Sequence, residues 1–203
     1  KLTLEGGIPE SPKDLDRLEC LEKLNLLSTK ITHLPDSICK LKHLKDLKLD
    51  PYWFLEKLPQ DLGRLECLEK LILSECVILR HIPDSICNMK LLQYFLLPGC
   101  IAIEKLPEEI GRLKCLRELN IEGTNIRHLP ESIFELRCLR IVGYRLLLQS
   151  YGLTSPIQTA EDETFFYVEL ILDNVAVTRT RSCSICQHRY LVGPNVLMVH
   201  HGG

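Results

Sequence analysis

The chain has 203 residues and carries 25 Lys and Arg against 27 Asp and Glu, which gives a formal net charge of -2. This near-neutral balance provides no electrostatic case for binding nucleic acid or an anionic membrane surface. No stretch approaches about 18 consecutive apolar residues, so the sequence predicts no transmembrane helix.

A block of the form I-x-x-L-P-x-x-I-x-x-L-x-x-L-x-x-L-x-L recurs along the chain every 23 or 24 residues. A fixed period in this range indicates a leucine-rich-repeat solenoid, in which stacked repeats bury a shared core. The first Leu position of the block falls at Leu18, Leu41, Leu65, Met89, Leu113 and Leu136.

The predicted strands follow the second half of each block. Strand side chains alternate between two faces, so the leucines are predicted to face the core and their neighbours the open, concave side. Residues 1–4 fit the end of such a strand, which predicts that the repeat array is incomplete at its N-terminus. Later strands are predicted at residues 24–26, 47–49, 71–73, 95–97 and 119–121.

Short convex segments are predicted where each block passes its L-P step. Proline suits the first turn of a helix, and an acidic residue there interacts favourably with the helix N-terminus. Such acids follow the proline at Asp36, Asp84, Glu108 and Glu131. The predicted fold class is an α/β repeat solenoid, a horseshoe with a parallel concave sheet and short helical or 3₁₀ convex segments.

The pattern changes near residue 146. It divides the chain into a solenoid of about six repeats over residues 1–145 and a C-terminal segment over residues 146–203. Residues 165–172 and 175–180, joined by Asp173-Asn174, predict a β-hairpin with a two-residue turn. The rest of this small segment is predicted to be partly β, with disorder expected at its end.

The outward strand positions predict three columns across the concave face. Apolar residues occupy its centre, and exposed apolar groups flanked by charges mark interaction sites. We therefore predict a protein-binding site at Ile72, Tyr94, Leu96 and Asn120, with Lys48, Lys70, Glu118 and Glu122 as its charged rim. The contact is either with another molecule or with another part of the same protein. The columns are Asn25, Lys48, Ile72, Leu96, Asn120, Gly143; Lys23, Asp46, Lys70, Tyr94, Glu118, Ile141; and Leu27, Asp50, Ser74, Pro98, Glu122, Arg145.

A basic column precedes the L-P steps along one flank and consists of His33, Lys57, His81, Lys105 and His128. Each histidine is flanked by lysine in the stack, which argues against metal binding. Two interpretations stay open: a solvated edge, or docking to an acidic partner surface.

Eight of the ten cysteines fall at repeat-equivalent positions. Cysteines placed by a repeat are expected to be small buried hydrophobes, and this favours a reducing, intracellular setting over a disulfide framework. They are Cys20, Cys67, Cys115, Cys138, Cys39, Cys87, Cys76 and Cys100.

The remaining two cysteines lie in the sequence Cys183-Ser-Ile-Cys186-Gln-His188, which resembles half a zinc site. Complete sites contain two ligand pairs with a proper spacer, and His200-His201 cannot form the second pair. The prediction is therefore no metal, with Cys183, Cys186 and His188 as the weak candidate.

Catalytic motifs are absent from the sequence. It contains no G-x-S-x-G, H-E-x-x-H or phosphate-binding P-loop pattern. We therefore expect no enzymatic activity and no cofactor in this chain.

Residues 18–139 resemble the repeats of plant intracellular nucleotide-binding immune receptors, most closely the class with an N-terminal TIR domain. The segment Leu73-Ser-Glu-Cys76 followed by His81-Ile-Pro-Asp-Ser-Ile86 is similar to that family's L-S-x-C and L-P-x-S-I pattern. Residues 117–133 are similar to its x-T-x-I-x-x-L-P-x-S-I form. Residues 165–180 resemble the start of the β-rich region that follows those repeats.

This resemblance implies a domain that recognises a pathogen effector or its host target and restrains signalling through nucleotide-binding and TIR domains. It implies a cytoplasmic location, with the nucleus also open. The near-neutral charge predicts no nucleic-acid or membrane partner. The alternative is a freestanding intracellular scaffold of the plant Ras-group type, whose repeats share L-P-x-x-I-x-x-L. A third hypothesis is a secreted receptor ectodomain, which predicts paired cysteines.

Overall fold

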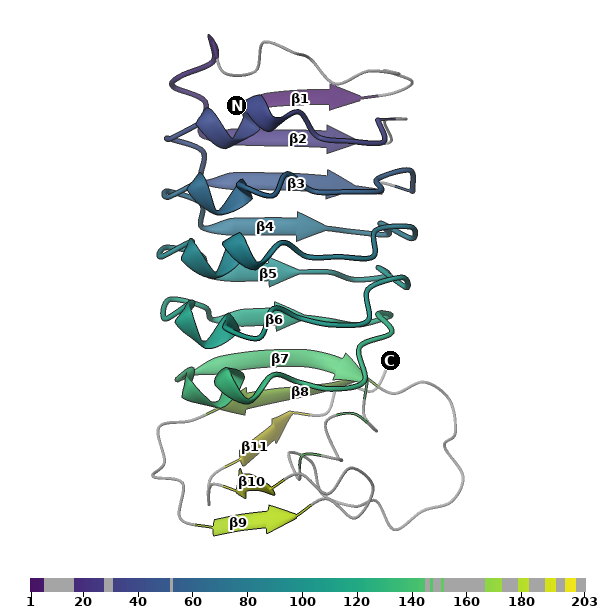
Figure 1. Ribbon diagram of the computed structural model, residues 1–203, viewed down its shortest axis with the longest axis vertical. Helices are drawn as coiled ribbons and strands as arrows, with labels where there is room; N and C mark the ends of the chain where they lie inside the picture. Colours follow the sequence, from purple (N-terminus) through teal and green to yellow (C-terminus); the bar gives the residue numbers. More distant parts are fainter. Residues whose placement is uncertain are drawn as a thin grey trace.

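The computed structural model describes residues 1–5, 17–27, 31–51, 53–144, 147 and 151 and the strands at 167–172, 179–182, 189–192 and 196–199. Within this part of the chain, seven parallel strands stack in sequence order in one open sheet (Figure 1). The predicted parallel sheet is confirmed, including the strand at the start of the chain. The strands are β1 Leu2–Glu5, β2 Lys23–Leu27, β3 Asp46–Asp50, β4 Lys70–Leu73, β5 Tyr94–Leu96, β6 Glu118–Asn120 and β7 Leu139–Tyr144.

The leucines of the repeats form one continuous core between the sheet and the convex turns. Leu47 and Leu49 of β3 are both fully buried, as are Leu71 and Leu73 of β4. Phe95 takes the leucine position in β5 and is also fully buried. Each such side chain contributes about 1.5–3 kcal/mol when it is buried. Stacking is what makes this possible, because a single repeat cannot enclose its own apolar face.

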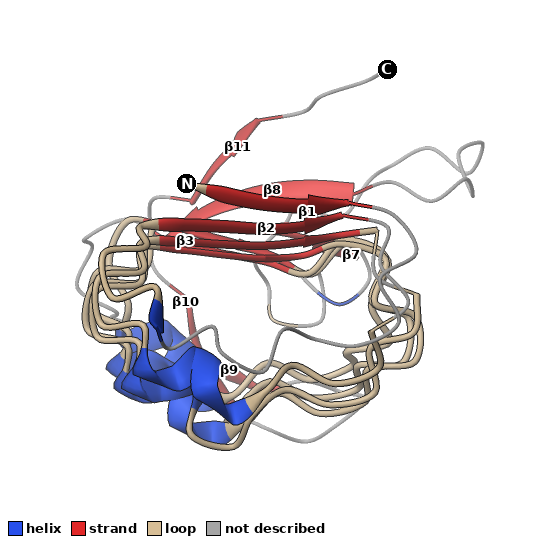
Figure 2. Ribbon diagram, turned by 90° about the horizontal axis from the view of Figure 1, so that it is seen from above, coloured by secondary structure: helices blue, strands red, loops and turns tan. Residues whose placement is uncertain are grey.

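Five short 3₁₀ turns cover the described convex side, opposite the sheet (Figure 2). The turns η2, η4 and η6 begin directly after a proline and with an acidic residue, as predicted. The turns η3 and η5 are shorter and begin three residues after their prolines. Their bounds are η2 Asp36–Lys40, η3 Leu62–Arg64, η4 Asp84–Asn88, η5 Ile110–Arg112 and η6 Glu131–Glu135.

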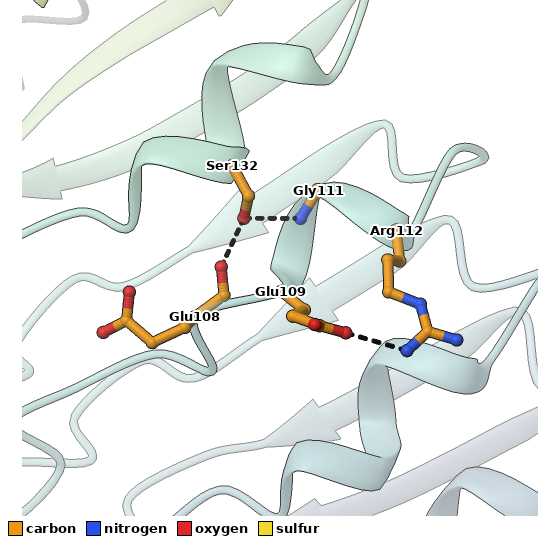
Figure 3. A network of polar contacts seen from close by, with 5 residues as sticks. All are labelled: Glu108, Glu109, Gly111, Arg112 and Ser132. Atoms are coloured by element: carbon orange, nitrogen blue, oxygen red, sulfur yellow. Dashed lines mark hydrogen bonds and ion pairs between the residues drawn. The ribbon is translucent and has the colours of Figure 1, made fainter.

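The two kinds of convex turn alternate and interlock. The N–H of Gly111 in η5 donates to Ser132 Oγ of η6 at 3.0 Å, and that hydroxyl donates to the Glu108 carbonyl at 2.6 Å (Figure 3). Gly63 and Ser85 repeat the first contact between η3 and η4, at 3.1 Å. A Cβ at Gly111 would lie 2.1 Å from the Ser132 carbonyl oxygen. Only glycine allows the two backbones to approach this closely.

Beyond the repeats, β8 Tyr167–Leu172 adds antiparallel to β7, and β11 Val196–Val199 pairs with the other edge of β8. The strand predicted within residues 165–172 is confirmed. Its predicted hairpin partner at 175–180 is wrong, because both edges of β8 are occupied. The open edge of β7 offers unpaired backbone groups, and this partner overrides the local turn signal. The antiparallel pair in this region is instead β9 Arg179–Ser182 with β10 Arg189–Val192.

Candidate functional site

The outward side chains of the sheet form the predicted columns from β2 to β6. The middle column pairs Asn25 with Lys48, Lys48 with Ile72, Ile72 with Leu96, and Leu96 with Asn120. The alternate residues of the same strands are buried beneath them. The structure therefore brings the predicted concave residues together on one face.

In β7 the predicted columns are wrong by one residue. Asn120 lies opposite Val142 instead of Gly143, and Glu118 lies opposite Arg140 instead of Ile141. Ile141 is fully buried. Because strand side chains alternate, a slip of one residue exchanges the inward and outward sets.

The cause of this slip lies between η6 and β7. Leu136, which directly follows η6, has a ψ of 142°, whereas the equivalent Leu113 after η5 has a ψ of 65°. Cys138 then takes a left-handed φ of 56°. The chain therefore enters β7 one residue earlier than the repeat predicts, and Arg140 occupies the outward position that was predicted for Ile141. Arg145, predicted to end the third column, lies outside the described residues.

An apolar group occupies the middle of the concave face. Ile72 on β4 lies opposite Leu96 on β5, and Tyr94 lies beside it in the next column. All three side chains are half-buried. The Lys70 ammonium lies 4.8 Å from the centre of the Tyr94 ring, a cation–π contact that holds the ring against β4.

Charged residues surround this group and pair with one another. Lys48 Nζ lies 2.7 Å from Asp50, and Arg140 Nη1 lies 2.9 Å from Glu118. At the N-terminal end of the sheet Lys23 Nζ lies 2.6 Å from Asp46, and this hydrogen bond raises the pKa of Lys23. The face thus neutralises its own charges, which favours a surface of mixed polarity as partner over a polyanion.

The two remaining predicted residues have a partly structural role. The Asn120 side-chain oxygen accepts a hydrogen bond from the Glu122 backbone N–H at 2.8 Å. This contact closes the turn after β6. Glu122 is half-buried, and its carbonyl accepts the N–H of Gly99 at 2.8 Å.

The basic column is exposed along its whole length but does not lie on the sheet face. Its members follow the post-strand loops on their way to the convex turns. His33 and Lys57 are joined by a parallel β-bridge, and His33 Nε2 lies 3.5 Å from Glu56. The five exposed residues are His33, Lys57, His81, Lys105 and His128.

The prediction of buried cysteines is right for two of the three repeat positions and wrong for the third. Burial raises the pKa of Cys39 and of Cys87 to about 11. Cys76 and Cys100 are fully buried beside each other in the loops that follow β4 and β5. The third set lies in the turn before each strand, where the leucines on either side face inward and the cysteine faces out. Cys20, Cys115 and Cys138 are exposed, and Cys67 is half-buried.

The weak zinc candidate at Cys183, Cys186 and His188 lies outside the described residues. Among the residues that the structure describes, no group of three or more His, Cys, Asp or Glu side chains is arranged to hold a metal ion. No helix in that part of the chain has the length and apolar character needed to cross a membrane.

A second apolar surface lies on the loops after the strands. In the sequence, residues 51–54 break the repeat and predict either a bulged loop or an aromatic contact point, whereas Ile78 and Ile101 give no such signal. Trp53, Phe54, Ile78 and Ile101 have exposed fractions of 53%, 47%, 43% and 59%. They are therefore more exposed than Ile72 and Leu96 on the sheet face. The available signal was the length of these repeats, since an extra loop residue brings apolar side chains to the surface.

Comparison with known families supports the fold. Residues 71–147 match the model of a leucine-rich repeat region. No curated protein matches the sequence at a significant level. The sheet, the 3₁₀ turns and this match together assign the fold as a leucine-rich-repeat solenoid.

Solved structures to which this chain is similar include a leucine-rich-repeat protein of Leptospira interrogans, at 26% identity and a TM-score of 0.56. The match covers 66% of this chain and 34% of that one, so this chain spans about a third of its length. Another is the ectodomain of the Arabidopsis thaliana membrane receptor kinase GASSHO1/SCHENGEN3, at 24% identity and a TM-score of 0.44, covering 64% and 19%. A third is the repeat domain of the type III effector XopL, at 20% identity and a TM-score of 0.33, covering 66% and 72%.

Proposed function

We propose that this chain is a protein-recognition and autoinhibitory repeat domain of a plant immune receptor that binds its partner on the concave sheet face. The observation that carries the proposal is the apolar group of Ile72, Tyr94 and Leu96. These side chains point away from the core on two adjacent strands, and a buried aliphatic or aromatic centre is what protein interfaces use for affinity.

The polar surroundings of this group support a protein partner. Lys48, Lys70 and Glu118 lie around the apolar centre and are held by neighbouring side chains. A held side chain loses little conformational entropy on binding. An apolar centre inside a polar, partly paired rim is the usual composition of a specific protein interface.

The immune-receptor assignment is supported by the repeat chemistry of the sequence. The pattern at residues 117–133 and the L-S-x-C segment at residues 73–76 are similar to the repeats of that receptor class. The eight described cysteines are free thiols, which supports a cytoplasmic location. Autoinhibition would then be exerted on nucleotide-binding and TIR domains of the same receptor.

The test is the double variant Ile72→Asp with Leu96→Asp in the full-length gene product, expressed in leaf cells. Two buried carboxylates in the interface are expected to abolish partner binding, or to release autoinhibition and produce cell death without a pathogen. Binding is measured with a photo-crosslinking residue placed at Asn120. Leu91→Asp is the matched control, because Leu91 is exposed and lies outside the sheet.

Unchanged crosslinks together with unchanged resting activity in the double variant would contradict the concave-face proposal. The freestanding scaffold makes a different prediction: its concave variant loses a partner without any autoactivity. The gene sequence upstream of Lys1 separates the two as well, since a G-x-x-x-x-G-K-[ST] motif there supports the receptor.

A further inference from the structure

The exposed apolar side chains of the post-strand loops form a row across three successive repeats. This loop-edge row consists of Trp53 and Phe54 after β3, Ile78 after β4 and Ile101 after β5. These loops stack on the flank toward which the strand arrows point (Figure 1). Neighbouring large apolar side chains at such exposure mark an interaction surface.

Backbone hydrogen bonds between repeats hold this row in place. Glu75 takes a left-handed φ of 52° and Gly99 one of 73° at the equivalent position. The Glu75 N–H donates to the Pro98 carbonyl and the Gly99 N–H to the Glu122 carbonyl, both at 2.8 Å. The Trp53 indole N–H donates to the Glu75 carboxylate at 2.9 Å. The surface is therefore formed before any partner arrives, which lowers the entropy lost on binding.

Cations lie directly beside the loop-edge row. Arg80 and His81 come two and three residues after Ile78, and Lys57 and Lys105 occupy the same position as His81 in the neighbouring repeats. All four side chains are exposed, and no described residue forms an ion pair with Lys57, Arg80 or Lys105. These cations differ from those of the concave face, where Lys23 and Lys48 each have a carboxylate partner.

The arrangement of charge on this flank selects the class of partner. Glu56 precedes Lys57, Glu104 precedes Lys105 and Glu75 is bonded to Trp53, so a carboxylate lies among the cations in each of the three repeats. A uniformly anionic partner such as nucleic acid or a lipid surface would meet these carboxylates and be repelled. A protein segment can place single carboxylates opposite the cations and apolar side chains on the loop-edge row.

We propose that this flank is a second docking surface, and that it binds an acidic segment with large apolar residues from a separate protein. The apolar side chains of that segment cover Trp53, Ile78 and Ile101. Its carboxylates pair with Lys57, Arg80 and Lys105. The surface is separate from the concave face, so the chain can hold two protein partners at once.

The experiment is a selection of a random peptide library displayed on phage against the immobilised full chain. Enriched peptides are expected to combine Asp or Glu with Leu, Phe or Trp. A synthetic copy of the most enriched peptide that lacks tryptophan is then titrated while the tryptophan emission of the chain is followed. Trp53 is the only tryptophan in the chain, so burial by the peptide shifts its emission to shorter wavelength.

Two double variants locate the binding. Ile78→Asp with Ile101→Asp is expected to abolish it, because carboxylates then replace the apolar contact. Lys57→Glu with Lys105→Glu is expected to weaken it about tenfold or more, since two attractive pairs become repulsive. Leu91→Asp, at an exposed leucine away from this flank, leaves binding unchanged.

The proposal is overturned if no peptide is enriched, if the enriched peptides carry no acidic residues, or if they bind Ile78→Asp with Ile101→Asp normally. If the peptides lose binding only to the double variant Ile72→Asp with Leu96→Asp, they bind the concave face. This result would also overturn the proposal. Binding of phosphatidylserine vesicles that depends on Ile78 and Ile101 would assign the flank to a membrane surface instead.

Discussion

The same repeats form the convex turns and the concave sheet, yet the residues on these two sides have different roles. On the convex side, neighbouring backbones approach so closely that Gly63 and Gly111 have no room for a side chain. On the concave side, an outward residue such as Lys48 is partly exposed and pairs with Asp50 on its own strand. Convex positions are therefore determined by packing, and concave positions are free to carry recognition.

This difference explains how one scaffold serves many partners. The inward leucines and the convex Gly–Ser contacts hold the repeats together. The concave columns can then change residue by residue without loss of the fold. Substitutions at the convex contacts should lower stability strongly, and substitutions of outward concave residues should lower it little.

The largest effect is expected for Gly111→Ala. The added Cβ would lie 2.1 Å from the Ser132 carbonyl oxygen, so two repeats must move apart. Overpacking against backbone costs about 3 kcal/mol, measured as a shift of the urea unfolding midpoint. Cys87→Ala at the equivalent position of η4 is the control and should cost about 1 kcal/mol. Wild-type stability of Gly111→Ala would contradict the required close approach.

A smaller effect is expected for Ser132→Ala, which removes the hydroxyl but adds no atoms. The Gly111 N–H and the Glu108 carbonyl each lose their partner (Figure 3). The Gly111 N–H is part-buried, and leaving it unsatisfied costs about 1–2 kcal/mol, whereas water can replace the hydroxyl at the exposed Glu108 carbonyl. Ser74→Ala on the sheet side should stay within about 0.5 kcal/mol. Equal losses in the two variants would show that the convex contact has no special role in stability.

The fold was largely predictable because the repeat encodes it twice, in the alternation of leucines and in the L-P step. That alternation placed the concave columns from β2 to β6 in the correct register. The slip at β7 arose from aligning the block on its first leucine, Leu136. That alignment places Val142 inward, whereas the alternating apolar residues Leu139 and Ile141 predict an inward set shifted by one residue. The alternation within the strand is the stronger signal.

The loop-edge row was not predictable in the same way, because loops have no periodicity that separates inward from outward residues. Whether Trp53 is packed or exposed depends on the path of the loop and on the left-handed turn at Glu75. The predicted hairpin partner of β8 was wrong for a related reason, since the pairing of β8 depends on the open edge of β7, which is distant in sequence. In both cases the deciding contact is remote in sequence.

The smallest effect on stability is expected at Lys48, in the middle of the concave face. Its ion pair with Asp50 is 2.7 Å long, but the two side chains are 38% and 33% exposed. Exposed pairs contribute about 0.2–1 kcal/mol, so a double-mutant cycle of Lys48→Ala and Asp50→Ala should give a coupling energy below about 1 kcal/mol. The coupling should fall further in about 1 M salt, because ions screen an exposed pair. A coupling above about 2 kcal/mol that resists salt would mean that charges of the concave face stabilise the strand that carries them, and the separation between a structural convex side and a variable concave side would then be lost.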